Sequence, residues 1–303
     1  MSTQIVSPRL FFTKASRCVV SRFPGLGTRH FVRDHLRKWC VDEDLPVYTR
    51  WGFNIGASPH DYASAGIFFF GDYDPEMTSV MQHHIRPGQH VWDLGTERGW
   101  FTLLMASLVG PQGRVDAFEA LPGNAAKVRR NCQTNGYDWV HVHAQAVTDQ
   151  LGVGSFVPPS DEVTNHTAFL HHCSGVGYLT AEVRPGTLNV PTTTLDDFAR
   201  ATGTSALHFL KMDIEGAEYK ALCGGRRVLE RFRPMLAIEY NRLTAQRAGT
   251  TVKQIYDLVA DLRYDQFTFT RHFEPFDLAR FDQIPDEAAI TNVYCFPRPV
   301  RAL

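Results

Sequence analysis

Short apolar runs alternate with longer amphipathic stretches over most of the chain. Apolar runs bounded by glycine, proline or polar clusters are typical of buried strands, whereas apolar residues at three- and four-residue spacing favour helices. The alternation predicts a three-layer α/β domain built around an open, doubly wound sheet. Strands are expected at 91–94, 114–119, 139–147, 206–212, 234–239, 264–270 and 290–296, and helices at 101–109, 122–135, 192–201, 214–222 and 252–262.

The first 80 residues follow the pattern less clearly. We expect a helix over 28–39, strand-like structure over 48–70 that ends in the buried apolar run Ile67 to Phe70, and a short helix that begins near Pro75. We interpret residues 1–80 as an N-terminal cap or extension. Residues 81–303 then form the main domain.

The alternation is interrupted over residues 154–191, where prolines, glycines and polar residues gather. A long loop inside a compact domain is usually functional or disordered. We therefore expect a hairpin or an insertion on the substrate side of the sheet.

The stretch VWDLGTERGWFT, residues 91–102, reads as strand, glycine turn and helix. Glycines allow a ligand to approach the unpaired N–H groups at a helix N-terminus. The spacing differs from both the dinucleotide fingerprint and the phosphate-binding loop, because a third glycine and a lysine are missing. The turn is therefore better suited to a nucleoside without phosphates, such as S-adenosylmethionine. The alternative is a turn that binds nothing.

Glu119 ends the second expected strand, 24 residues after Gly95. A carboxylate has two oxygens that can accept both hydroxyls of a ribose. Beside the glycine turn, Glu119 is therefore expected to bind the ribose of the cofactor, although a strand-end glutamate can also be a plain surface residue.

Carboxylates also end other expected strands. Ligands of doubly wound sheets bind beyond the carboxyl ends of the strands, and nearby carboxylates would stabilise a positively charged sulfonium. Methyl transfer needs an aligned nucleophile and a base that removes its proton. Candidate bases are Asp213, Glu239, His84, His166, His171 and His172. Loop histidines are commonly surface residues, so Asp213 and Glu239 are the stronger candidates. Asp213, Glu239 and Asn241 could alternatively ligate Mg²⁺, but we favour a site without a metal.

The composition is that of an ordinary globular protein. The chain has 303 residues, of which 44% are hydrophobic, and a formal net charge of −1. This charge gives no reason to expect nucleic acid or an anionic membrane as a partner. The six cysteines are scattered without zinc-site spacing and are expected to be free thiols. The N-terminus does not resemble a secretory signal, so a cytoplasmic location is expected.

The segment KMDIEGAEYKAL, residues 211–222, resembles the FkbM-family methyltransferases, which depend on S-adenosylmethionine. The segments VWDLGTERGWFT, DAFEALPGN, TTTLDDF and ERFRPMLAIE extend the similarity in the family's order. The resemblance covers roughly residues 66–240 and implies a class I methyltransferase fold, which is Rossmann-like, with seven strands of which the last is antiparallel.

The resemblance also implies roles for single residues. Asp93, Gly95 and Gly99 would form the cofactor turn, Glu119 would contact the ribose, and Ala146 with Val147 would lie near the adenine. Tyr73 and Glu76 fall in GDYDPEM, which is similar to the family's element beside cofactor or substrate.

One departure from the family pattern affects the cofactor turn. Glu97 replaces an amide that commonly faces the methionine end. Its carboxylate could bind the cofactor's amino group or could weaken cofactor binding.

The resemblance implies an O-methyltransferase whose acceptor is a hydroxyl, or a carboxylate, of a small natural product, sugar or glycosylated metabolite. The N-terminal region would set substrate choice or contacts in a homodimer. The alternative is a catalytically inactive binding or scaffold protein, supported by Glu97. An NAD-dependent dehydrogenase is disfavoured because the third glycine is missing.

Overall fold

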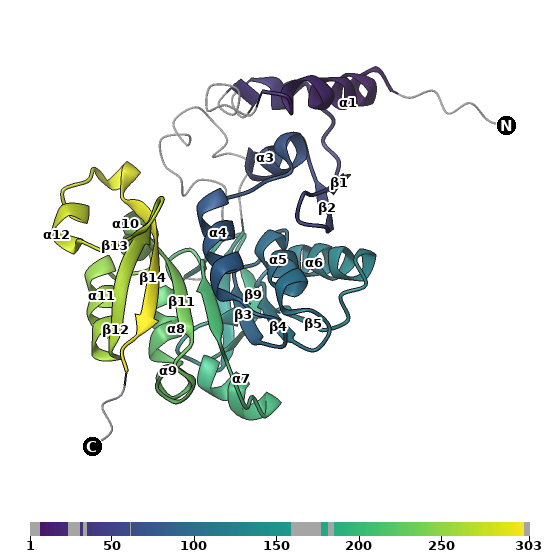
Figure 1. Ribbon diagram of the computed structural model, residues 1–303. Coiled ribbons are helices and arrows are strands. Elements are labelled where there is room, and N and C mark those ends of the chain that lie inside the picture. Colours follow the sequence, from purple (N-terminus) through teal and green to yellow (C-terminus); the bar gives the residue numbers. More distant parts are fainter. Residues whose placement is uncertain are drawn as a thin grey trace.

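The computed structural model describes residues 7–23, 31–32, 35–60, 62–158, 177–180 and 185–299. Its centre is an eight-stranded sheet with the order β13-β12-β14-β11-β10-β3-β4-β5 (Figure 1). The strands are β3 (His90–Leu94), β4 (Arg114–Phe118), β5 (Val140–His143), β10 (Phe209–Met212), β11 (Met235–Asn241), β12 (Tyr264–Phe269), β13 (Phe273–Pro275) and β14 (Ile290–Pro297).

Five neighbouring strands, β5, β4, β3, β10 and β11, are parallel. β14 lies between β11 and β12 and is antiparallel to both. This is the seven-strand class I methyltransferase order with its antiparallel last strand, so the expected fold class is confirmed. β13 adds an eighth strand at the edge through a hairpin with β12. Parallel strands end at one edge of the sheet, which places the strand-end carboxylates together.

Helices cover both faces of this sheet and confirm the three layers. One face packs against α4 (Pro75–His84), α5 (Trp100–Val109) and α6 (Pro122–Thr134). The other face packs against α7 (Leu195–Thr202), α8 (Glu218–Cys223), α9 (Arg226–Phe232) and α11 (Val252–Asp261). Short helices α10 (Arg242–Arg247), α12 (Leu278–Phe281) and η3 (Asp286–Ala288) complete the C-terminal part.

The stretch expected as one strand over 139–147 divides between two sheets. β5 ends the central sheet, and β6 (Ala146–Val147) begins a four-stranded sheet with the order β6-β9-β7-β8. Its other strands are β7 (Gly152–Val157), β8 (Tyr178–Thr180) and β9 (Leu188–Thr193). The described part of the interruption at 154–191 is therefore a small sheet, and residues 159–176 and 181–184 lie outside the described residues.

The N-terminal region differs from expectation in its secondary structure. The apolar run Ile67 to Phe70 is buried but belongs to helix α3 (Tyr62–Phe70), so the strand-like interpretation of this segment is wrong. A helix that is apolar all round has no helical periodicity in its sequence and resembles a buried strand. Helix α1 (Pro8–Val20) was not predicted. In its described part, the expected helix over 28–39 contains the short 3₁₀ turn η1 (Leu36–Trp39).

The hairpin of β1 (Leu45–Tyr48) and β2 (Asn54–Ala57) is fixed to the main domain through α6. The Asn135 amide accepts a hydrogen bond from Asn54 N at 2.7 Å and donates one to Asn54 O at 2.7 Å. Asn131 accepts from Gly56 N at 3.1 Å. One hydrophobic core contains residues of the N-terminal extension and of the sheet face that packs against α4, α5 and α6.

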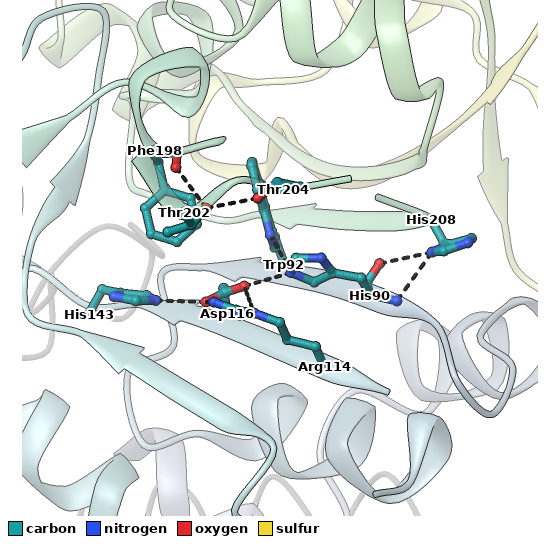
Figure 2. Close-up of polar contacts among 9 residues, drawn as sticks. All are labelled: His90, Trp92, Arg114, Asp116, His143, Phe198, Thr202, Thr204 and His208. Atoms are coloured by element: carbon teal, nitrogen blue, oxygen red, sulfur yellow. Dashed lines mark hydrogen bonds and ion pairs between the residues drawn. The ribbon is translucent and has the colours of Figure 1, made fainter. Parts of the chain in front are cut away.

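A buried ion cluster lies under α7 on the other face of the sheet (Figure 2). The Asp116 carboxylate is fully buried and accepts hydrogen bonds from His90 at 2.6 Å, His143 at 2.9 Å and Arg114 at 2.8 and 2.9 Å. Burial alone would raise the pKa of Asp116, but these donors outweigh it and hold the pKa well below its ordinary value. The cluster joins the first residues of β3 and β4 to the end of β5.

Candidate functional site

The glycine turn after β3 approaches the neighbouring strand end very closely. Gly95 has a φ of +78°, and a Cβ atom there would lie 1.8 Å from the carbonyl oxygen of Asp213. Gly99 has a φ of +88° and precedes α5 as its N-cap. Glu97 also has a positive φ, of +50°. The turn therefore needs glycine at position 95 to fit against the end of β10.

Asp93 supports this turn from inside the protein. Its buried carboxylate accepts a hydrogen bond from Thr102 at 2.6 Å and lies 3.5 Å from the Lys211 ammonium. Lys211 also donates to the carbonyl of Gly95 at 3.0 Å and lies 3.5 Å from Asp213. Burial alone would lower the pKa of Lys211, but Asp213, Asp93 and Glu239 outweigh it and raise the pKa. A charged lysine therefore links the turn to the strand-end carboxylates.

Lys211 was not predicted as part of the site. The only signal is a lysine within the apolar strand FLKM, where a buried charge needs a partner.

Glu119 lies directly beside the glycine turn. Its two carboxylate oxygens accept hydrogen bonds from Glu97 N and Leu121 N, each at 2.9 Å. Each oxygen retains a further lone pair, so the carboxylate can still accept ribose hydroxyls. Burial raises the pKa of Glu119 despite these two bonds.

Ala146 and Val147 are both buried in β6. Ala146 belongs to a small apolar cluster against which Leu121, two residues after Glu119, packs. Val147 belongs to the core on the α7 face of the sheet.

Carboxylates gather around the ends of β10 and β11. Glu239, in β11, accepts a hydrogen bond from the Asn241 amide at 3.3 Å. Burial, together with the negative charges of Asp213 and Glu215, raises the pKa of Glu239 well above its ordinary value. The sequence predicted Asp213 and Glu239 at this edge.

Tyr73 faces the same carboxylates. Its ring packs edge-on against Phe101, with ring centroids 5.8 Å apart. Burial raises the pKa of Tyr73, and the charges of Glu97 and Asp213 raise it further. The phenol therefore remains protonated and can donate a hydrogen bond.

The loop between β10 and α8 contributes two glutamates that sequence reasoning missed. Glu215 has a φ of +56°, and its Oε2 is buried with no hydrogen-bond partner among the described residues. Glu218 accepts hydrogen bonds from Ile214 N at 2.8 Å and Gly216 N at 2.9 Å, and burial raises its pKa to about 7. The available signal was the succession of acidic residues and a glycine directly after a buried strand.

The strand order adds another missed residue, Asn292 of β14. It pairs in register with Glu239 and donates a hydrogen bond to Asp74 at 3.0 Å. Asp74 has a φ of +39° and caps α4 by accepting from Met77 N at 2.9 Å. This bond holds the segment that contains Tyr73 against the central sheet.

The histidine candidates are not part of this arrangement where the structure describes them. His84 packs edge-on against Phe273 and Phe296, and burial lowers its pKa. His166, His171 and His172 lie outside the described residues. Within the described part of the chain, no three His, Cys, Asp or Glu side chains are grouped as metal ligands, and the cysteines are free.

Comparisons with known proteins match the chain to methyltransferases. The family model "Methyltransferase FkbM domain" matches residues 88–265. A protein-L-isoaspartate O-methyltransferase of Ignicoccus hospitalis is 36% identical over 114 residues, which cover 37% of this chain and 46% of the relative. A second, of Pyrococcus horikoshii, is 30% identical over 115 residues, covering 37% and 43%. The chain thus spans less than half the length of these curated relatives.

Among solved structures, similarity is found to the FkbM methyltransferase of Methylobacillus flagellatus, at 16% identity and a TM-score of 0.42, covering 78% of this chain and 53% of the other. The O-methyltransferase of Bacillus cereus in complex with SAH is similar at 14% identity and a TM-score of 0.42, covering 75% and 83%. The family model covers more than half of the chain, including the glycine turn and the carboxylates at the ends of β10 and β11. The chain therefore belongs to the FkbM methyltransferase family.

Proposed function

We propose that this chain is an S-adenosylmethionine-dependent O-methyltransferase that acts on a hydroxyl of a small natural product, sugar or glycosylated metabolite. The observation that carries the proposal is the buried carboxylate of Glu239, whose pKa is raised by burial and by neighbouring negative charge. A carboxylate with a raised pKa is a stronger base than an exposed one. Such a base suits an acceptor that must lose a proton.

The residues present fit the cofactor. The Gly95–Gly99 turn would hold the nucleoside, Glu119 would accept its ribose hydroxyls, and Ala146 with Val147 would line the adenine. When bound, S-adenosylmethionine supplies an electrophilic methyl group on a positively charged sulfur. Carboxylates nearby would lower the cost of holding that charge in a partly dry site. Glu97 and Asp213 are the candidates for the cofactor's amino group.

Glu239 would accept the proton of the acceptor hydroxyl. Tyr73, which stays protonated, would donate a hydrogen bond that orients the acceptor. Asp213 lies 3.5 Å from Lys211, which donates a hydrogen bond to the carbonyl of Gly95, so the strand-end carboxylates are connected to the cofactor turn. Alignment of the nucleophile is the main contribution a protein makes to such a transfer.

A carboxylate acceptor is a second candidate, favoured by the curated relatives that are named protein-L-isoaspartate O-methyltransferases. The charges around Glu239 argue against it. An acceptor carboxylate would meet Asp213 and Glu215 and would be repelled. A neutral hydroxyl carries no such penalty, and the hydroxyl acceptor is therefore the proposal.

Cofactor binding tests the first half of the proposal. Calorimetric titration with S-adenosylmethionine and with its demethylated product should show binding, and Glu119→Ala should weaken it about 10- to 100-fold, because hydrogen bonds to a charged group are lost. Glu230→Ala, at an exposed glutamate of α9, is the matched control and should leave the affinity unchanged. Absence of binding to the unmodified chain would sink the proposal.

Methyl transfer tests the second half. With radiolabelled S-adenosylmethionine and a panel of monosaccharides and polyhydroxylated aromatics, Glu239→Gln should lower turnover by about 10²- to 10⁴-fold without weakening cofactor binding. The rate of the unmodified enzyme should rise with pH as Glu239 ionises, and this rise should disappear in the variant. The control Glu274→Gln alters an exposed carboxylate of β13. Binding without transfer to any acceptor would instead support the inactive scaffold alternative.

A further inference from the structure

The charge of the chain is divided unevenly. Its first 40 residues contain eight lysines and arginines and one acidic residue, a net charge of +7, whereas the remaining residues carry −8. The overall value of −1 hides this division. A strongly basic segment on an otherwise acidic protein indicates an anionic partner for that segment.

Helix α1 exposes several of its apolar residues, although Val20 is buried. The buried side contains Thr13, which bonds to Arg9 O and accepts from Val41 N, and it contains Arg17, whose guanidinium lies 5.0 Å from the centre of the Phe68 ring. The exposed side contains Phe11, which is 70% exposed, and Val19, which is 60% exposed. α1 lies on the outside of the molecule above α3 (Figure 1). A helix on a water-exposed surface normally buries its apolar side chains and exposes its polar ones, which is the opposite arrangement.

Cationic side chains accompany the exposed apolar ones. Lys14 and Arg22 are exposed on α1 and just after it, and Phe23 next to Arg22 is 63% exposed. Trp39, beside exposed Lys38, is 69% exposed. Aromatic rings, an apolar helix face and lysines or arginines in one segment are the features of helices that lie in a membrane interface.

We propose that α1, together with the exposed side chains of Arg22, Phe23, Lys38 and Trp39, forms a docking surface for anionic phospholipid bilayers. The apolar face of α1 enters the interface between headgroups and acyl chains, and the cationic side chains bind lipid phosphates. Among the described residues no helix has the length and apolar content needed to cross a bilayer. The chain would therefore lie on the membrane and not span it.

The net charge of the first 40 residues, together with the exposed apolar face of α1, favours an anionic bilayer over a second copy of the chain or a nucleic acid. A second copy of the chain would bring two segments of +7 together, and like charges oppose such a contact. A nucleic acid would be bound through its phosphates by the cations alone and would leave the exposed Phe11 and Val19 in water. An anionic bilayer uses both the charges and the apolar face.

Vesicle sedimentation of the full chain tests the proposal. The protein should pellet with vesicles of phosphatidylcholine and phosphatidylglycerol, should remain in solution with phosphatidylcholine alone, and should be released at high salt. The double variant Phe11→Ser/Val19→Ser should lower the partition coefficient at least about tenfold, because two apolar side chains no longer enter the interface. The matched control is Leu151→Ser/Val153→Ser, which alters two exposed apolar side chains near and in β7 and should change nothing.

A second pair of variants tests the charges. Lys14→Glu/Arg22→Glu should abolish binding to anionic vesicles, whereas Arg130→Glu/Arg271→Glu makes the same change of net charge at exposed positions elsewhere and should preserve most of it. Circular dichroism would establish that each variant is folded.

Four results would overturn the proposal. The first is no pelleting with anionic vesicles, and the second is an equal loss in the matched controls. The third is a dimer, seen by light scattering, that Phe11→Ser/Val19→Ser dissociates. Retention of a single-stranded RNA oligonucleotide in place of vesicles would likewise reject a membrane as the partner.

Discussion

Gly95 is the residue on which the geometry of the turn depends most directly. Its backbone is in the left-handed region, and the place of a Cβ is already occupied by the Asp213 carbonyl. The closeness of these two strand ends is what places a cofactor turn beside the carboxylates of the proposed acceptor site. Glycine is needed here for both reasons.

Gly95→Ala should therefore lower the free energy of unfolding by at least about 2 kcal/mol, since backbone strain and a displaced carbonyl add up. It should also weaken cofactor binding at least about tenfold. Chemical denaturation and calorimetry measure the two effects. Gly123→Ala in α6, where a Cβ would meet nothing within 4 Å, is the control. Equal stability of the two variants would contradict this account of the turn.

The sequence predicted the residues whose chemistry is tied to a strand end. Gly95, Glu119 and Glu239 stand directly beside such an end, and the structure places them at one edge of the sheet. Lys211 could not be predicted from the sequence, because the residues around it do not show which carboxylate a buried lysine will contact. Nor could Asn292, since its neighbours Glu239 and Asp74 are set by the order of the strands and not by the sequence around it.

At the level of elements, the loop between β10 and α8 is fixed by the helix that follows it. Glu218, in the first turn of α8, accepts from two backbone N–H groups of that loop. The loop includes Gly216, where a Cβ would lie 2.3 Å from Thr244 O. The first turn of α8 therefore fixes the backbone of the loop that contains Asp213 and Glu215.

Glu218 should make stability depend on pH. Its pKa is raised from 4.5 to about 7 in the folded protein, so the unfolded chain releases this proton first and stability falls as pH rises from about 4.5 to about 7. The loss amounts to about 3 kcal/mol. Glu218→Gln cannot ionise, so the free energy of unfolding of the wild type relative to that of the variant should fall by about this amount between pH 4 and pH 8, measured by chemical denaturation. A difference that is constant with pH would contradict the assignment.

Helices with a regular spacing of apolar residues and a marked first turn were predicted well, and helices without these features were not. α4, α6, α7 and α11 begin within a few residues of their expected positions because proline or threonine marks each start. α3 was mistaken for strand because its residues are buried on all sides. α1 was not predicted, and its apolar residues are divided between its two sides, since Phe11 and Val19 are exposed whereas Val20 is buried.

At the scale of the whole molecule, the N-terminal extension is tied to the main domain close to the cofactor turn. Asn131 of α6 accepts from Gly56 N in the hairpin and donates to Arg98 O in the turn, each at 3.1 Å. Arg98 in turn lies 2.6 Å from Asp44, just before β1. The extension and the cofactor turn are therefore not independent.

Asn131→Ala should increase the mobility of both the β1–β2 hairpin and the cofactor turn. It leaves one N–H and one carbonyl without partners, at a cost of about 1–3 kcal/mol. Hydrogen exchange should speed up across residues 45–57 and at the turn, and remain unchanged in β10 and β11. Gln133→Ala, on an exposed position of the same helix, is the control. Faster exchange throughout the chain would show a general loss of stability in place of the specific link.

The overall topology could be expected from the alternation of strands and helices, and the place of the antiparallel strand from the family resemblance. The small sheet of β6 to β9 could not, since its strands are short and lie far apart in the sequence. The excess of basic residues among the first 40 positions is visible in the sequence, but the net charge of −1 for the whole chain does not show it.

The bond between Asn292 and Asp74 joins residues 218 positions apart. During synthesis, a ribosome would therefore release the glycine turn and the first carboxylates long before Asn292. The cluster of strand-end carboxylates would lack this neighbour until β14 inserts between β11 and β12. Ligand binding at the cluster would then have to wait for the synthesis of β14.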